Sequence, residues 1–214
     1  MENRKKVFSP PDGLKLVLAS GSPRRSDLLK QIGLENFLSD AADVDETVKK
    51  LEVPKKYASR IALEKAETVK RRHPNCFVLA ADTVVTCGTR ILDKPGSKIQ
   101  AEKCLRRLSG RSHNVLGAFV VIGENNQYVK RLVNSSVTFK RLDEQEISNY
   151  LASEEWIGKA GGYAIQGRGA AFIKKIRGSY SNVVGLPIHE VYNVLRGLGF
   201  NYKEYNRREE YFDF

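Results

Sequence analysis

The pattern of hydrophobic and polar positions predicts strands and helices along most of the chain. A short apolar run at 14–19 (LKLVLA) lies between polar residues, which is typical of a buried strand. The run at 76–85 (CFVLAADTVV) is almost wholly apolar, as in a central strand covered on both faces. Two longer strands are expected at 115–122 and 128–140, and 161–179 predicts strand and loop interrupted by glycines.

Helix signals occupy the stretches between these strands. Ser22 fits an N-cap, Pro23 fits the first helical position, and Gly33 fits the end of the same helix. A second helix over 54–72 has its apolar residues on one stripe. Further helices are expected from Ser97 to near Gly110, from Asp143 with Glu146 as its capping-box partner, and over 187–196. Helices and strands that mix without strict alternation predict an α/β fold with a mixed twisted sheet and flanking helices.

The chain of 214 residues has the length of one ordinary domain. We expect that domain at 14–200, between an N-terminal extension at 1–13 and a charged C-terminal tail at 201–214. No apolar run is long enough for a membrane-spanning helix, and the first residues do not resemble a signal peptide. The three cysteines lack metal-site spacing, which favours a reduced chain in the cytoplasm; they are Cys76, Cys87 and Cys104.

The formal net charge is +11, and the two terminal segments contribute almost none of it. A basic body of this kind suits nucleic acid, an acidic surface or a polyanionic small substrate. A nucleic-acid-binding regulator is therefore one hypothesis. Against it, the basic residues are dispersed, and the chain has no helix-turn-helix, zinc or RNA-recognition signature.

Arg24 and Arg25 occupy the first turn of a predicted helix, where the backbone dipole disfavours a cation by ~0.3–1 kcal/mol. Two arginines beside free backbone N–H groups suit a phosphate or another anion. The alternative is that both guanidinium groups turn to solvent or to a carboxylate.

Three more polar residues stand out against their surroundings. Lys65 lies on the apolar stripe of the second helix, although a lysine is rarely buried unpaired; the alternative is that it snorkels to the edge of the stripe. Asp82 follows the apolar run VLAA, so we expect it where a strand ends and ligands gather, unless it only caps a turn. A hairpin through the CGTR turn would bring Lys94 back near Asp82.

The acidic cluster Asp43, Asp45 and Glu46 offers the oxygen ligands that magnesium prefers, or is simply a solvated loop. Gln166 has an amide that can both donate to and accept from the edge of a base. The glycine-rich run around it lacks the phosphate-loop pattern. The three histidines are scattered along the chain, and we expect each of them to be structural.

Eight segments together resemble the Maf family of nucleoside triphosphate pyrophosphatases. They are LASGSPRRSDLL, DVDET, ALEKA, AADTVV, LDKP, LSGRSH, KAGGYAIQG and GSYSNVVGLP, in the family's order over about 14–197. The resemblance implies two lobes around a central cleft, a fold related to inosine triphosphate pyrophosphatases. It also implies metal-dependent hydrolysis of a nucleoside triphosphate to a monophosphate and pyrophosphate.

By the same resemblance, Asp82 matches the family's proton acceptor, and three residues match its other polar active-site positions, namely Glu46, Lys65 and Lys94. We expect Glu46 and Asp82 to hold Mg²⁺ or Mn²⁺, and we leave open which of them is the base. The expected substrate-binding residues are Ser20, Ser22, Arg24, Arg25, Thr83 and Gln166.

The motifs SGSPRR, ADT and AIQG resemble the branch that acts on dTTP and UTP, and the alternative is the branch that acts on 7-methyl-GTP. Expected partners are a nucleoside triphosphate and, by family likeness only, a second copy in a homodimer, with neither nucleic acid nor membrane. The family's association with septum formation keeps a nucleic-acid-binding regulator of that process as the alternative of another class. The chain departs from the family at Gly117, where threonine is common.

Overall fold

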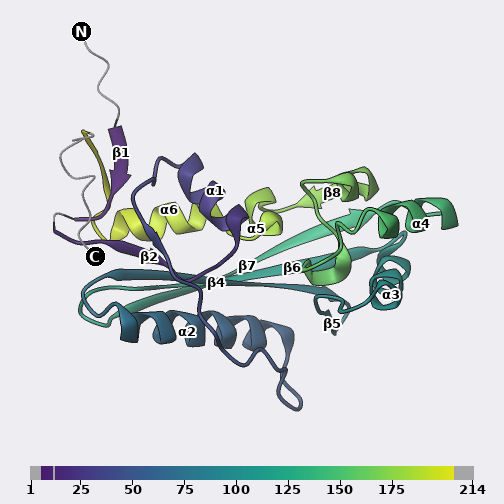
Figure 1. The fold of residues 1–214 in the computed structure, drawn as a ribbon, viewed down its shortest axis with the longest axis horizontal. Helices are drawn as coiled ribbons and strands as arrows, with labels where there is room; N and C mark the ends of the chain where they lie inside the picture. The colour runs from purple at the N-terminus through teal and green to yellow at the C-terminus, as the bar shows by residue number, and fades with distance from the viewer. Residues whose placement is uncertain (1–5, 12, 205–214) are drawn as a thin grey trace, which may run out of the picture.

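A computed structural model describes residues 6–11 and 13–204, and its central feature is a seven-stranded mixed sheet (Figure 1). The strand order is β3-β2-β4-β6-β7-β8, and β5 pairs with β4. The strands are β2 (Leu16–Leu18), β3 (Leu38–Ser39), β4 (Phe77–Cys87), β5 (Arg90–Leu92), β6 (Ser112–Ile122), β7 (Tyr128–Phe139) and β8 (Ile173–Arg177). The long strands β4, β6 and β7 are neighbours in the middle of this order.

The sheet is parallel at one end and antiparallel elsewhere, which confirms the predicted mixed sheet. Strand β2 pairs in parallel with β3 and with the first residues of β4, and the remaining neighbours are antiparallel. On the edge of β4 away from β6, the described strands cover only Phe77–Leu79, paired with β2, and Val85–Cys87, paired with β5. The middle of β4, residues 80–84, therefore has no strand neighbour on that side.

Six α-helices and two short 3₁₀ helices are present in the described part of the chain. They are α1 (Pro23–Gln31), α2 (Pro54–Arg72), α3 (Lys98–Leu108), α4 (Glu144–Ala152), α5 (Tyr180–Val184), α6 (Ile188–Gly197), η1 (Ala160–Gly162) and η2 (Arg168–Phe172). The predicted caps of α3 and α4 are confirmed, since Ser97 accepts from a backbone N–H and Asp143 forms a full capping box with Glu146. Ser22 stands at the N-cap of α1, but its side chain makes no capping hydrogen bond.

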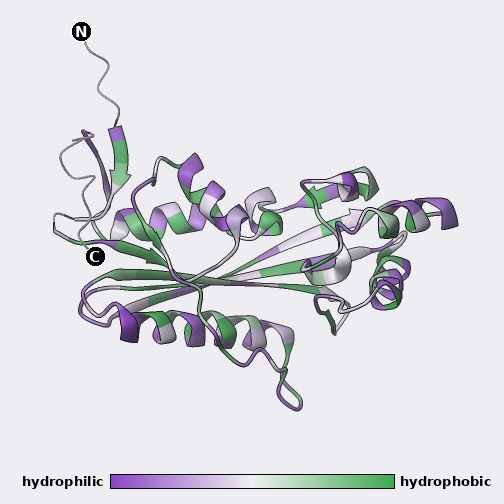
Figure 2. Cartoon of the chain, viewed as in Figure 1, coloured by the Kyte–Doolittle hydropathy of each residue, from purple (hydrophilic) through white to green (hydrophobic). Residues whose placement is uncertain are grey.

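The helices cover the sheet in two lobes. Helix α2 lies on one face of the sheet while α1 and α6 lie on the other, and α3 and α4 pack around the far end of the long strands (Figure 1). The apolar stripe of α2 faces the sheet and its polar side faces outward (Figure 2). Alanines at 58, 62 and 66 on that stripe are fully buried, and their small side chains allow the helix to approach the strands closely.

Two expectations need correction. Asp82 does not follow the end of a strand: it lies in the middle of β4, opposite Ala118 of β6, because Thr83 to Cys87 continue the strand as β-branched and apolar residues. No strand is expected in either terminal segment, yet β1 (Lys6–Ser9) pairs antiparallel with β9 (Asn201–Glu204). The rest of the expected tail, 205–214, lies outside the described residues.

No helix in the described ranges combines the length and the apolar character that crossing a membrane requires.

His113 of β6 is a core residue, with 1% of its surface exposed. Its Nε2 lies 2.8 Å from the hydroxyl of Tyr163, and its ring packs edge-on against Phe139. Burial lowers the pKa of His113 to about 4, because its charged form would lose its hydration.

The stability of the fold should therefore depend on this histidine. Between pH 6.5 and 4 the unfolded chain binds a proton at this position that the folded chain does not, so the stability that is present above pH 6.5 is lost as the pH falls. The loss should reach about 3 kcal/mol by pH 4. Urea unfolding of His113→Gln at several pH values should show a flatter profile than the wild type. His189→Gln, at an exposed position, is the control and should keep the wild-type profile.

Candidate active site

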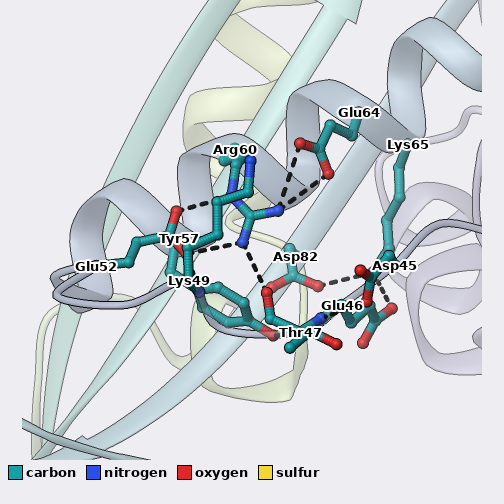
Figure 3. Close-up of polar contacts among 10 residues, drawn as sticks. All are labelled: Asp45, Glu46, Thr47, Lys49, Glu52, Tyr57, Arg60, Glu64, Lys65 and Asp82. Carbon is teal, nitrogen blue, oxygen red and sulfur yellow. Dashed lines mark hydrogen bonds and ion pairs between the residues drawn. The ribbon is translucent and has the colours of Figure 1, made fainter.

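A lysine bridges two carboxylates at the centre of the candidate site. Lys65 Nζ lies 2.7 Å from Glu46 Oε1 and 2.8 Å from Asp82 Oδ1 (Figure 3). Lys94 Nζ lies 3.5 Å from the other carboxylate oxygen of Glu46, Oε2. The side chains of Lys65 and Asp82 are each only 9% exposed. A buried lysine of this kind is stable only with carboxylate partners, and it has two.

Local structure explains why these three groups meet. Lys65 lies on the stripe of α2 that faces the sheet, so it is buried with its apolar neighbours and does not snorkel outward. Side chains alternate along a strand, so Asp82 points to the same face of β4 as the residues that pack on α2, namely Val78, Ala80 and Val84. Glu46 comes from the segment between β3 and α2, which passes beside the helix (Figure 3).

The surrounding positive charges lower the pKa of Glu46. Partial burial raises the pKa of Glu46, but the hydrogen bond and positive charge of Lys65, aided by Lys94, outweigh it and lower the pKa overall. Glu46 is therefore a carboxylate at neutral pH, held between two cations. The neighbouring Asp45 accepts a hydrogen bond from the backbone N–H of Thr47 and takes no part in the cluster.

A fixed arginine lies on the opposite face of β4. Arg25 donates from Nε to the Gly185 carbonyl at 2.9 Å, from Nη1 to Ser20 Oγ at 3.0 Å and from Nη2 to Thr83 Oγ1 at 3.3 Å. Gly185 has φ of 144°, a conformation that favours glycine, and this directs its carbonyl at both Arg25 and Thr83. Burial lowers the pKa of Arg25, although Asp82 opposes the shift, and the guanidinium stays charged.

Residues from both faces of β4 line two adjoining cavities. A cavity of 170 Å³ adjoins another of 220 Å³, and both are lined by Asp82, Thr83 and Lys94. The first cavity lies between the helices α1 and α5 on one side and the segment around η1 on the other. It has one acidic lining residue, Asp82, and five basic ones, namely Arg24, Arg25, Lys65, Lys94 and Lys159. Such an excess of positive charge favours a polyanionic ligand.

The structure brings nearly all of the predicted site residues together. Eight of them line the first cavity: Ser22, Arg24, Arg25, Lys65, Asp82, Thr83, Lys94 and Gln166. Glu46 lines the second cavity. Ser20 lines neither cavity. Its hydroxyl accepts hydrogen bonds from Arg25 Nη1 and from the backbone N–H of Ser22, so its observed contacts hold Arg25 in place.

Lys159 is the main lining residue that sequence reasoning missed. Burial lowers the pKa of Lys159, and the nearby charge of Arg24 lowers it further. Lys159 is half-buried and belongs to an irregular segment before η1, where no helical or strand periodicity predicts which side chains face a cavity. The only signal was its place in the quoted segment KAGGYAIQG.

A larger groove of 930 Å³ lies along α3 and β5, but of the predicted site residues only Lys94 lines it. Its one acidic residue is Asp93. The groove therefore contains neither Asp82 nor Glu46, the two carboxylates that bind Lys65.

Comparison with known proteins identifies the family of this chain. The family described as "Maf-like protein" matches residues 15–198. The chain belongs to the Maf family. A relative from Paramagnetospirillum magneticum, named dTTP/UTP pyrophosphatase, is 54% identical over 185 residues, covering 86% of this chain and 97% of the relative. A relative of the same name from Caulobacter vibrioides is 50% identical over 188 residues, covering 88% and 97%.

A solved structure of a nucleoside-triphosphatase / dITP/XTP pyrophosphatase from Mycobacterium abscessus is also similar in part. It is 13% identical with a TM-score of 0.42, covering 86% of this chain and 94% of the other.

The departure from the family at Gly117 has a local explanation. A Cβ atom at Gly117 would overlap Oδ1 of Asn182 on α5. Asn182 is fully buried, and its amide nitrogen donates to the Val115 carbonyl and to Ser135 Oγ. The missing side chain thus leaves space that the Asn182 carboxamide fills, and no proposed catalytic group is affected.

Removing the central cation should leave a buried charge without a partner. In the absence of divalent ions, Lys65→Met should lower the free energy of unfolding by about 3–5 kcal/mol. The double variant Lys65→Met/Asp82→Asn should be more stable than Lys65→Met alone, because Asp82 no longer buries an unpaired charge. Urea denaturation followed by circular dichroism measures both. Equal stability of the single and double variants would contradict the bridging role of Lys65.

Proposed function

We propose that this protein is a hydrolase that converts UTP and dTTP to the nucleoside monophosphate and pyrophosphate, and so removes unwanted nucleotides. The observation that carries the proposal is a cavity lined by five cations, one of which, Lys65, is buried between two carboxylates. The names of the two relatives, which cover most of this chain, support the same activity.

The phosphate chain is the part of the substrate that the cations would recognise. A triphosphate carries about four negative charges, and cleavage between the α and β phosphorus atoms adds charge to the departing pyrophosphate. Arg25 is held rigidly by three acceptors and still has N–H groups to offer a phosphate. Fixed donors of this kind stabilise developing charge without reorganisation. Lys94 and Lys159 would add mobile positive charge on the other walls.

Asp82 is our candidate for the proton acceptor. Both carboxylate oxygens of Glu46 are engaged, one by Lys65 and one by Lys94. Asp82 uses only Oδ1 for Lys65, and Oδ2 has no hydrogen-bond partner among the residues that the structure describes. That free oxygen could take the proton of an attacking water, while Lys65 keeps the carboxylate in position.

The same two carboxylates are the ones that would hold a divalent cation, Mg²⁺ or Mn²⁺. Magnesium sites in proteins commonly use one or two carboxylates together with substrate phosphates, which fits Glu46 and Asp82. The described residues contain no cluster of three or more histidine, cysteine, aspartate or glutamate ligands, so the substrate would have to supply ligands as well. When bound, such an ion would neutralise phosphate oxygens and acidify a bound water.

Base selection would come from Gln166 together with other residues of the same cavity. A uracil or thymine edge offers an acceptor, a donor and an acceptor, and the carboxamide of Gln166 can pair with two adjacent groups of that edge. Thr83 and Arg24 line the same cavity, and they would complete the selection. A mismatched base leaves buried polar groups unpaired, so discrimination can be steep. The runner-up function is hydrolysis of 7-methyl-GTP or another modified nucleotide at this site.

The cellular setting that we propose is the cytoplasm, with a nucleotide as the ligand rather than nucleic acid or a membrane. A homodimer is the assembly that we propose from family likeness. The alternative of another class, a nucleic-acid-binding regulator of septum formation, predicts salt-dependent DNA binding without nucleotide hydrolysis.

The role of Asp82 can be tested directly. Asp82→Asn should lower kcat for UTP by on the order of 10²- to 10⁴-fold, because the amide cannot accept the proton. Thermal unfolding and the fluorescence of Trp156, the chain's one tryptophan, would show that the variant folds. Near-normal turnover by the folded variant would remove Asp82 from the mechanism.

A nucleotide panel tests the function itself. UTP, dTTP, CTP, ATP, GTP and 7-methyl-GTP are each incubated with Mg²⁺, with Mn²⁺ or with a chelator, and the products are separated. We expect monophosphate and pyrophosphate, with kcat/KM for UTP and dTTP on the order of 100-fold above that for purine nucleotides. Efficient turnover of 7-methyl-GTP instead would favour the runner-up. Hydrolysis of none of them, with salt-dependent oligonucleotide binding, would favour the regulator.

A further inference from the structure

Glu46 belongs to a segment with little structure of its own. Between β3 and α2 the described chain forms no helix or strand, and most residues from Asp43 to Val53 are exposed. A side chain on such a segment can be held in place only by contacts with its surroundings. For Glu46, those contacts come largely from one face of α2 (Figure 3).

Arg60 of α2 binds the parts of the segment that follow Glu46. Its Nε lies 2.7 Å from Glu52 Oε1 and its Nη2 lies 2.7 Å from Glu52 Oε2, so the pair is bidentate. Nη2 also donates to the backbone carbonyl of Thr47 at 3.0 Å, one residue after Glu46. Glu64, one turn further along α2, lies 3.2 Å from Nη1 and orients the guanidinium from behind.

Tyr57, also on α2, binds the backbone of Glu46 itself. Its hydroxyl donates to the backbone carbonyl of Glu46 at 2.9 Å, and the guanidinium of Arg60 lies over its ring, 5.6 Å from the centroid. The carbonyls of Glu46 and Thr47 are therefore both bound by side chains of α2. The carboxylate of Glu46 can meet Lys65 on that same helix only while this part of the segment stays against it.

We infer that Arg60 is a positioning residue for the reaction, which clamps the 43–53 segment onto α2 and so places the carboxylate of Glu46 against Lys65 and Lys94. The inference rests on the proposed function, in which Glu46 belongs to the catalytic cluster. Arg60 lines neither site cavity, so it acts through Glu46 and not on the substrate. Bidentate pairing needs the planar fork of arginine, which lysine cannot reproduce.

The clamp is built to persist over a wide pH range. The hydrogen bonds from Arg60 lower the pKa of Glu52 to about 2, and the same contacts raise the pKa of Arg60. Both groups therefore remain charged from acidic to alkaline pH. The segment is held constantly and does not switch with pH, so the loss of Arg60 should reduce kcat by a similar factor at every pH of the profile.

The experiment compares Arg60→Met with Arg60→Lys, Glu52→Gln and the control Arg71→Met. Arg71 lies on the same helix, is exposed, and donates a hydrogen bond only to Thr68 among the described side chains. Arg60→Met should lower kcat for UTP on the order of 10- to 100-fold, because small displacements of a reacting group are costly, while KM changes less. Arg60→Lys should recover only part of the loss, Glu52→Gln should weaken kcat in the same direction, and Arg71→Met should match the wild type.

Hydrogen exchange read by mass spectrometry provides a measurement that does not depend on catalysis. Amides of residues 43–53 should exchange faster in Arg60→Met than in Arg71→Met, while peptides from β4 and β6 stay unchanged. If the wild type hydrolyses UTP and both Arg60→Met and Glu52→Gln keep its kcat, the positioning role is wrong. If the wild type hydrolyses no nucleotide, the proposed function fails, and the exchange data still show whether Arg60 holds the segment.

Discussion

The contact of Lys65 with two carboxylates is the interaction on which the site depends. A lysine on the inner stripe of a helix would be too costly to bury alone, so its presence requires acidic partners from other segments. Asp82 comes from the middle of a strand and Glu46 from an irregular segment, and neither is close to Lys65 in sequence. The small side chains around Lys65 on α2 allow the helix to lie near enough to β4 for these contacts.

The incomplete pairing of β4 is the second constraint. Neighbouring residues of a strand point to opposite faces of a sheet, which would normally keep Asp82 and Thr83 in separate environments. On the edge away from β6, none of the described strands lies beside residues 80–84 of β4, so both faces open onto one cavity at this place. On one face, Asp82 lines that cavity and binds Lys65 of α2. On the other face, Thr83 lines the cavity and accepts a hydrogen bond from Arg25 of α1.

Much of this could be predicted from local patterns. Capping residues and helical stripes act within a few residues, so the start of α2 at Pro54 and the caps of α3 and α4 were correct from sequence. Lys65 stood out as a lysine on an apolar helical stripe, and the paired arginines stood out as cations in the first turn of a helix. Ser20 and Lys159 contradict no local pattern of this kind, and their surroundings depend on contacts with distant segments. Their observed places, one holding Arg25 and the other lining the cavity, could not be predicted in the same way.

The sequence by itself determined the α/β class, the order of the elements and membership of the Maf family, because hydrophobic periodicity, caps and motifs are local properties. Tertiary structure decided that Asp82 lies within a strand and not beyond its end, and that β1 pairs with β9 across the length of the chain. It also decided that Arg60 holds the segment that carries Glu46. These outcomes depend on which distant segments pack together, and a contact across space has no signature in the residues nearest to it.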